Sequence, residues 1–289
     1  MGKLSKRKSL ADKAWRRLIW RMAFDQLLLL AAIQGITEFI PVSSSGHLVL
    51  GHEWGGTVHA DAPSSAVLDV ALHLGTLVAV MVYFRQDFER LAMGAWDVLQ
   101  AKQTKPRQEA LNMAYATVPV LLAAALLLGL GLVDALRTPE IVAWASILFA
   151  VPLYLADRYG TSAKAVSDMA ARPALLMGLA QMLALIPGAS RAGVTIMAGR
   201  ALGFSREAAA RYSMFMAMPV IFSFALFGLL DLWLVGNVTA LGEALVGAML
   251  AALFALASID IFLKLTRRFS LLPFVLYRIG MGGVILLTM

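Results

Sequence analysis

The chain has 289 residues, of which 60% are hydrophobic and 15% are charged, and its formal net charge is +7. Soluble domains average about 45–50% apolar and about 25% charged residues, so this composition excludes an ordinary soluble protein and predicts a multi-pass membrane protein. The chain contains no cysteine, which excludes disulfides, thiol catalysis and thiolate metal sites.

The first 22 residues carry eight Lys or Arg against one Asp. Apolar residues such as Trp15 and Trp20 interleave with these charges, which predicts a basic amphipathic tail over residues 1–23 that binds membrane headgroups. Nucleic acid is the other kind of partner that such a charge run attracts, and we expect none here. Residues 24–289 then form a single membrane domain.

The membrane domain begins with a short apolar segment, 24–40, that ends at Pro41. Three longer apolar segments follow at 66–84, 110–132 and 141–156. A second short segment, 173–186, ends at Pro187, and three more long segments occupy 209–232, 244–263 and 271–289. One bilayer crossing needs about 20 apolar residues, so six of these segments are candidate transmembrane helices, with 141–156 the shortest.

The two short segments are each closed by proline, followed by small polar residues and then by a further apolar stretch. Proline ends a helix, and broken backbone at membrane depth is tolerated only where protein or a water-filled cavity surrounds it. We therefore expect two re-entrant helical hairpins. The predicted fold is an all-α integral membrane protein with about six transmembrane helices plus these hairpins.

The two broken segments resemble each other. IPVSS (40–44) matches IPGAS (186–190), with a serine three residues after each proline, and Gln34 and Gln181 lie upstream. This predicts an internal repeat, with one copy at 24–156 and the other at 173–289. Each copy holds one hairpin and three crossings, and an odd number of crossings inverts one copy relative to the other. Chance similarity between two Pro-Ser turns is the alternative.

Lys and Arg concentrate in four connecting segments, 85–109, 157–172, 200–211 and 264–268, which predicts that these lie in the cytoplasm. Six crossings then place both termini outside. The basic tail opposes that placement, but an interfacial helix can keep its charges at the membrane surface, so we retain the assignment from the loops.

Polar residues gather at the first break. Gln34 and Glu38 lie four residues apart and share one helix face. Ser43, Ser44 and Ser45 lie where a new helix begins, and the free N–H groups of a helix start favour an anion. His47 falls in the first turn of that helix.

The second break offers the same helix start at Ser190 and adds Arg191, whose guanidinium suits phosphate oxygens. If the two breaks face each other, they form a site for a phosphate or diphosphate. A carboxylate and an imidazole beside a hydroxyl further favour an enzyme over a bare transport pore, because they permit nucleophile or water activation and proton transfer.

Each residue also has a simpler interpretation. Ser43 and Ser45 could be helix caps only, His47 could be a buried histidine with its bonds satisfied, and Glu38 could serve the serine amides. Four further polar residues lie in apolar segments. Asp69 and His73 form a pair four residues apart with an expected supporting role, whereas Arg278 and Asp260 either lie near membrane surfaces or pair together.

The stretches QGITEFIPVSSSGHL (34–48) and LALIPGASRAGVTI (183–196) resemble the two signature segments of the undecaprenyl-diphosphate phosphatase family of the bacitracin-resistance type. LDVALHLGTLVAVMVYF (68–84), FMAMPVIF (215–222) and FVLYRIGMG (274–282) agree with it as well. The resemblance covers residues from about 24 to 289.

This resemblance implies an integral membrane phosphatase that removes the terminal phosphate from the diphosphate of the isoprenoid carrier lipid, which recycles the carrier for peptidoglycan synthesis. It also implies resistance to bacitracin, which binds that diphosphate. The implied fold contains inverted repeats and two re-entrant hairpins in the bacterial inner membrane, with the site open to the periplasm and a divalent cation, Mg²⁺ or Ca²⁺, supporting activity.

Matched position by position, the resemblance places the acidic motif on Gln34 and Glu38, the hydroxyl and imidazole functions on Ser44 and His47, and the arginine function on Arg191. Many members have Glu where this chain has Gln34, so Glu38 is expected to carry the acidic role and to bind the cation. Many also have Ser where this chain has Ala192, so that hydroxyl is dispensable or Thr195 supplies it.

The expected function is therefore hydrolysis of undecaprenyl diphosphate to the monophosphate, and the alternative is a translocase for polyprenyl phosphate. The sequence does not fix the oligomeric state, and a homodimer is kept as one option. The site prediction is divided by role. Expected to be catalytic are Glu38, Ser44, His47 and Arg191; expected to bind substrate are Gln34, Ser43, Ser45, Gly188, Ser190 and Thr195.

Overall fold

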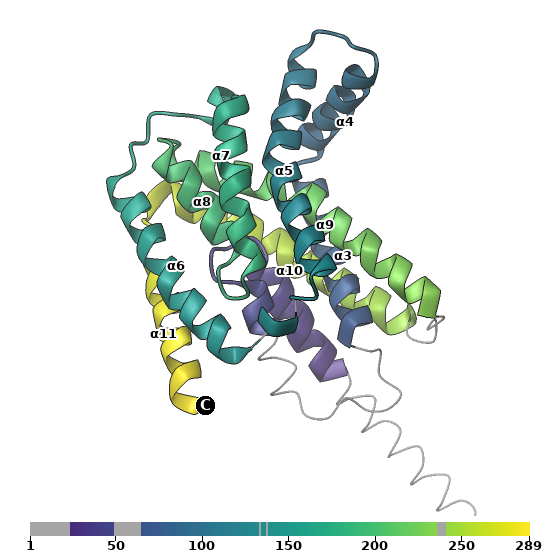
Figure 1. The fold of residues 1–289 in the computed structure, drawn as a ribbon, viewed down its shortest axis with the longest axis vertical. Helices are drawn as coiled ribbons and strands as arrows, with labels where there is room; N and C mark the ends of the chain where they lie inside the picture. The colour runs from purple at the N-terminus through teal and green to yellow at the C-terminus, as the bar shows by residue number, and fades with distance from the viewer. Residues whose placement is uncertain (1–23, 49–64, 133, 137, 236–240) are drawn as a thin grey trace, which may run out of the picture.

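The computed structural model describes residues 24–48, 65–132, 134–136, 138–235 and 241–289, so the predicted tail at 1–23 lies outside the described residues. Helices dominate these residues, and no β-strand occurs among them (Figure 1). One isolated β-bridge joins Lys164 to Phe204. The predicted all-α fold is confirmed.

The first half of the chain holds a helix at Phe24–Thr37, a helical turn at 44–48, α3 (Ser65–Tyr83), α4 (Arg85–Leu99), α5 (Lys105–Gly129), the 3₁₀ turn η1 (Asp134–Leu136) and α6 (Pro139–Tyr159). The second half holds η2 (Val166–Asp168), α7 (Ala171–Gln181), η3 (Met182–Leu185), α8 (Arg191–Ala201), α9 (Arg206–Val235), α10 (Leu241–Arg268) and α11 (Leu272–Thr288). Both short segments predicted to break do break, at 38–43 and at 186–190.

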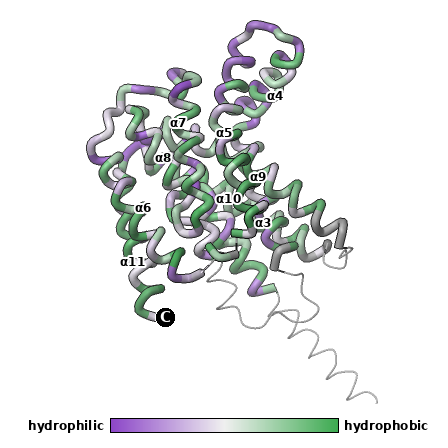
Figure 2. Tube along the Cα trace, in the orientation of Figure 1, coloured by the Kyte–Doolittle hydropathy of each residue, from purple (hydrophilic) through white to green (hydrophobic). Residues whose placement is uncertain are grey.

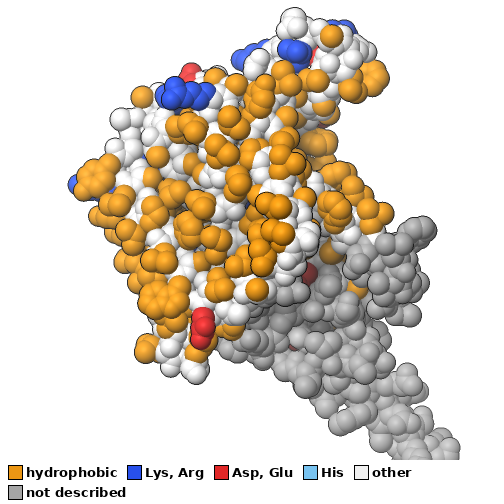
Figure 3. Space-filling view, viewed as in Figure 1, with side chains coloured by type: hydrophobic (Ala, Val, Ile, Leu, Met, Phe, Trp, Pro, Cys, Tyr) orange, Lys and Arg blue, Asp and Glu red, His pale blue; other side chains and the backbone are white. Residues whose placement is uncertain are grey.

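Four helices, α5, α6, α9 and α10, are each long and apolar enough to cross a membrane. The pair α3 and α4 also passes that test, although it bends by 94° at its break, and α11 is a shorter apolar helix. Apolar side chains cover most of the face seen in Figure 3, and several Lys and Arg lie along its upper edge near the α4–α5 hairpin. The chain is a multi-pass membrane protein; the count of six crossings stays a prediction.

The prediction of a loop at 85–109 is wrong. This segment contains α4 and the start of α5, which pack together as a hairpin. Figure 2 shows hydrophilic residues gathered at the end of this hairpin. Gly94 permits the close approach, because a Cβ there would lie 2.0 Å from the carbonyl oxygen of Pro106. Thr104 caps α5 by accepting a hydrogen bond from the Arg107 N–H. The charged residues of α4 interrupt its apolar residues in the sequence, which is why no helix was predicted there.

Two glycines seat the broken helices against their neighbours. A Cβ at Gly35 would lie 2.6 Å from the carbonyl oxygen of Ala251 in α10, and one at Gly178 would lie 2.7 Å from that of Ala116 in α5. Small residues allow such close helix packing in membranes. Each broken helix therefore packs closely on a long helix, as an inverted repeat would require, although the repeat itself stays a prediction.

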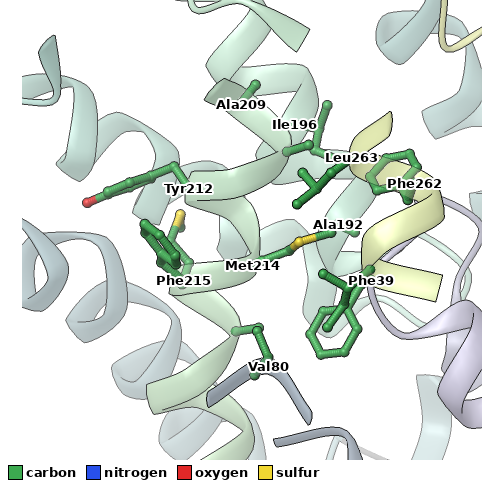
Figure 4. Packing of buried hydrophobic residues seen from close by; sticks show 14 of the residues in the cluster. Phe39, Val80, Ala192, Ile196, Ala209, Tyr212, Met214, Phe215, Phe262 and Leu263 are labelled. Atoms are coloured by element: carbon green, nitrogen blue, oxygen red, sulfur yellow. The ribbon is translucent and has the colours of Figure 1, made fainter. Parts of the chain in front are cut away.

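The main buried cluster joins the two breaks through apolar packing. Phe39, at the first break, and Ala192, at the start of α8, belong to the same cluster as Met214 and Phe215 of α9 (Figure 4). This cluster fixes the position of the first break against α8 and α9, and so brings together residues that are about 150 positions apart in the chain.

Candidate active site

The first break ends in a strained serine. Ser43 has φ 75°, in the left-handed region that residues other than glycine rarely adopt. Its Oγ accepts a hydrogen bond from the Gly46 N–H at 3.4 Å and lies 3.3 Å from the Ser45 Oγ. Its carbonyl oxygen accepts from the His47 N–H at 3.3 Å, so Ser43 is the cap of the helical turn at 44–48.

The second break repeats this geometry at Ser190, which has φ 68°. Its Oγ accepts from the Gly193 N–H at 3.1 Å, and its carbonyl oxygen accepts from the Val194 N–H at 2.9 Å. Ser190 therefore corresponds to Ser43, which corrects the predicted match with Ser44 by one residue. The turn after the second proline is one residue longer, and Ser44 and Arg191 occupy the same position, first in each new helix.

Glu38 is the residue on which the two breaks meet. Its Oε2 accepts hydrogen bonds from the Gln34 Nε2 at 2.9 Å and from the Ser44 Oγ at 2.8 Å. Its Oε1 lies 3.2 Å from the Arg191 Nη2, which also donates to the Glu38 carbonyl oxygen at 3.0 Å. Glu38 is 8% exposed. A carboxylate, a hydroxyl and a guanidinium thus form one connected cluster.

Arg191 is held on its other side by α9. Its Nη1 donates to the Ser213 carbonyl oxygen at 2.9 Å, and its guanidinium lies 5.9 Å from the ring centroid of Phe39. Thr195 donates to the Arg191 carbonyl oxygen at 2.7 Å, and the Thr195 and Ser213 hydroxyls are 2.7 Å apart. The guanidinium is therefore fixed by contacts with both breaks and with α9.

The His47 ring makes no hydrogen bond with the Ser44 hydroxyl. Its Nδ1 is 2.7 Å from the Ser43 carbonyl oxygen, which can only accept, so Nδ1 carries the proton. Its Nε2 is 2.6 Å from the Tyr277 Oη, and the two rings stack with centroids 5.6 Å apart. The partner of Ser44 is Glu38, so the expected activation of Ser44 by His47 does not match this geometry.

The remaining predicted residues surround the cluster. Ser45 is exposed, whereas Ser190 and Thr195 are buried and bonded within the protein. Gly188 has φ +92°, and a Cβ there would lie 2.3 Å from the Val142 carbonyl oxygen, so this position requires glycine. These three buried residues shape the site, and Ser44 and Ser45 are the hydroxyls that remain accessible.

The sequence pattern of the family described as bacitracin resistance protein BacA matches residues 27–284. This chain belongs to that family. A protein of Maricaulis maris named undecaprenyl-diphosphatase is 43% identical over 268 residues, covering 92% of this chain and 98% of that protein. Proteins of the same name from a Ruegeria species and from Nitrosococcus oceani are 39% and 40% identical, each with 98% of its length covered.

The structure of this BacA family member brings further residues to the site, some of them named in the sequence analysis without a site role. The His73 Nε2 lies 3.9 Å from the Glu38 Oε2, so the expected supporting role of His73 is at the site itself. Arg278 does not pair with Asp260, which instead accepts bonds from Lys264 and Tyr83. An arginine inside an apolar helix was the available signal for Arg278. No sequence pattern indicated that Ser213 contacts Arg191 or that Tyr277 contacts His47.

A cavity of about 600 Å³ lies elsewhere in the BacA fold, between α4, α5, η2 and α9. Asp87, which is paired with Arg90 and Arg211, lies on its wall. None of the predicted site residues lines it. The predicted catalytic residues Glu38, Ser44 and Arg191 therefore lie together outside this cavity.

Proposed function

We propose that this chain hydrolyses undecaprenyl diphosphate to undecaprenyl phosphate and inorganic phosphate, the activity stated in the names of its relatives. The observation that carries this proposal is the chain of contacts from Ser44 through Glu38 to Arg191. A nucleophile hydrogen-bonded to a base, beside a cation that can hold phosphate, is the arrangement that phosphoryl transfer requires.

In the first step, the Ser44 Oγ attacks the terminal phosphorus while its proton passes to Glu38, whose Oε2 is 2.8 Å away. The bond from that phosphorus to the bridging oxygen breaks, and polyprenyl phosphate leaves. In the second step, water attacks the phosphoserine, which releases phosphate and restores the Ser44 hydroxyl. In the alternative, Ser44 and Glu38 orient the water that attacks the diphosphate directly.

Arg191 supplies the positive charge. In the free protein its partner is Glu38, and the diphosphate would compete with that carboxylate for the guanidinium, which frees Glu38 to accept the proton. The starts of the turn at 44–48 and of α8 add backbone N–H groups that favour an anion. His47 would exchange a proton with the leaving oxygen or with water through its Nε2, once the Tyr277 hydroxyl is displaced from that nitrogen.

A divalent cation fits the oxygen atoms present. Among the described residues no group of three His, Asp or Glu is clustered as a metal cage. Gln34, however, has a buried Oε1 without a hydrogen-bond partner, and the Nε2 of the same amide donates to the Glu38 carboxylate. Gln34 and Glu38, with substrate phosphate oxygens, would hold Mg²⁺ or Ca²⁺, and the ion would neutralise charge on the diphosphate.

Gln34→Ala should reduce the maximal rate less than about tenfold, because Glu38 keeps its bonds to Ser44 and Arg191. The concentration of Mg²⁺ needed for half-maximal activity should rise, since one oxygen ligand is lost. A titration with Mg²⁺ after chelation measures both quantities. Gln181→Ala is the matched control, because Gln181 is equally buried but donates to Ala116 in α5; an equal shift there would contradict a role of Gln34 in cation binding.

The function is tested with purified protein in liposomes that contain undecaprenyl diphosphate. We expect release of phosphate that depends on Arg191 and stops when divalent cations are chelated. If the wild type releases no phosphate, the proposed function is wrong. Movement of labelled polyprenyl phosphate across the same liposomes tests the translocase alternative, which the names of the relatives do not favour.

We further propose that the protein lies in the bacterial inner membrane with the site facing the periplasm. The support is that Lys and Arg concentrate in the segments 85–109, 157–172, 200–211 and 264–268, because cytoplasmic segments of membrane proteins carry an excess of these residues. A homodimer stays a prediction, and the mass of the protein in detergent tests it.

A further inference from the structure

Arg278 of α11 lies between the two breaks and is 0% exposed. One of its guanidinium nitrogens, Nη1, donates to the Pro41 carbonyl oxygen of the first break at 3.4 Å and to the Ala189 carbonyl oxygen of the second at 2.9 Å. Its Nη2 donates to the Gly188 carbonyl oxygen at 3.0 Å. Its remaining contacts are with the carbonyl oxygens of Ala145 and Ser146 in α6. One side chain thus binds both breaks at once.

These contacts also orient the amide groups of the second break. In a planar trans peptide the C=O and the following N–H point in opposite directions. Arg278 holds the Ala189 carbonyl oxygen, so the Ser190 N–H is directed away from this guanidinium, at the start of the helix that carries Arg191. Arg278 therefore fixes the orientation of the amide groups at the start of α8.

The first turn of α8 has a space that this guanidinium fills. A Cβ at Gly193 would lie 2.8 Å from the Arg278 Nη1. The Arg191 side chain extends from the same turn to Glu38 and Ser213. The first turn of α8 is therefore fixed by the contacts of Arg191 and by those of Arg278.

Among the described residues Arg278 has no carboxylate as an ion-pair partner, and all its hydrogen bonds there go to carbonyl oxygens. A buried cation without a counter-ion is costly in a membrane protein, so its position calls for a role. Only an arginine has enough donors, in a rigid fork, to bind several carbonyl groups of two separate loops together.

We propose that Arg278 is a positioning residue that fixes one break against the other, so that Ser44 and Glu38 of the first meet Arg191 of the second. Its effect on catalysis rests on the proposed function. Its effect on the distance between the breaks does not depend on that function, so the positioning role and the proposed function can be refuted separately.

The distance is measured with spin labels, which the absence of cysteine makes straightforward. Ser45→Cys and Leu183→Cys place one label beside each break; Ser45 is exposed, and Leu183 is 38% exposed. We expect a narrow distance distribution in the otherwise unchanged protein. Arg278→Gln and Arg278→Lys should both broaden or shift it, because neither side chain can bridge the two loops.

Arg200 provides a matched control. It is 1% exposed and donates to the carbonyl oxygens of Thr161, Gly160 and Phe204, but it lies at the other end of α8. Arg200→Gln should lower thermal stability as Arg278→Gln does, yet leave the label distance unchanged. If Arg278→Gln also leaves it unchanged, the proposal is wrong.

Activity provides the second measurement. A misplacement of about 1 Å can cost about 100-fold in rate, so Arg278→Gln and Arg278→Lys should each lose roughly that much kcat per folded protein, with a smaller change in KM. Gly193→Ala, which keeps Arg278 but displaces it, should lose activity in the same direction. Full activity in Arg278→Lys would show that charge alone suffices and would overturn the proposal. A wild type without activity but with the expected label distances would refute the function and leave the positioning role intact.

Discussion

Arg191→Ala should abolish nearly all phosphate release, with a loss of about 10³-fold or more in kcat, since an arginine that stabilises a transferring phosphoryl group contributes 10³–10⁵-fold. The structure gives the reason: this guanidinium is the cationic group that contacts Glu38, and it is fixed by the Ser213 carbonyl oxygen. Steady-state phosphate release, expressed per folded protein, measures the loss.

Two comparisons separate chemistry from folding in this variant. Removing one partner of a buried ion pair costs about 3–5 kcal/mol, so Arg191→Ala should also lower the thermal midpoint. Arg191→Lys keeps the charge but cannot bind Glu38 and Ser213 as a fork, and it should recover only part of the rate. Arg267→Ala, which removes an exposed arginine paired with Glu207, should leave activity unchanged. Wild-type rates in folded Arg191→Ala would contradict the proposed site.

Glu38→Gln should also lower kcat, by about 10²–10⁴-fold, because the amide cannot accept the Ser44 proton. Binding should change in the opposite direction. The carboxylate no longer pairs with Arg191, so the guanidinium is free for phosphate, and in the absence of divalent cations a non-hydrolysable diphosphate should bind at least as tightly as it binds the wild type. Calorimetry with that analogue, beside the rate assay, measures both effects.

Asp260→Asn is the matched control for this change, because Asp260 is a carboxylate that pairs with Lys264 on the protein surface. It should alter neither the rate nor the binding. If the Glu38→Gln protein binds the analogue much more weakly than the wild type when divalent cations are chelated, the carboxylate itself contributes to substrate binding, which would contradict its assignment as the group that only accepts the proton and binds the cation.

Local chemistry was readable from the sequence. The apolar segments predicted the helices to within a few residues, because a membrane helix must be both long and apolar. Pro41 and Pro187 predicted both breaks, and the unusual polar residues near them predicted Glu38, Ser44 and Arg191 as neighbours in space. Polar groups at membrane depth are costly, which is why the signal was strong.

What the sequence could not supply was the contact of each side chain. The turn after Pro187 is one residue longer than that after Pro41, so matching prolines misassigned the equivalent serines, and only the positive φ of Ser43 and Ser190 reveals the true pair. The partner of His47 is Tyr277, 230 residues away, and no local pattern specifies such a contact. The role of Arg278 depends on carbonyl groups, which every residue possesses.

The α4 helix was missed for a related reason. Its charged residues marked it as a loop, but Asp87 is paired with Arg90 and Arg211 and is buried against α9. Charged residues in a membrane protein therefore do not by themselves indicate irregular structure.

The central claim, that the two breaks form one site, is tested most directly by a double-mutant cycle on kcat between Ser44→Ala and Arg191→Ala. Residues that act together in one step are strongly non-additive. We predict that the double variant is about as slow as the slower single variant. Losses that multiply, as expected for two groups acting independently, would contradict a shared site.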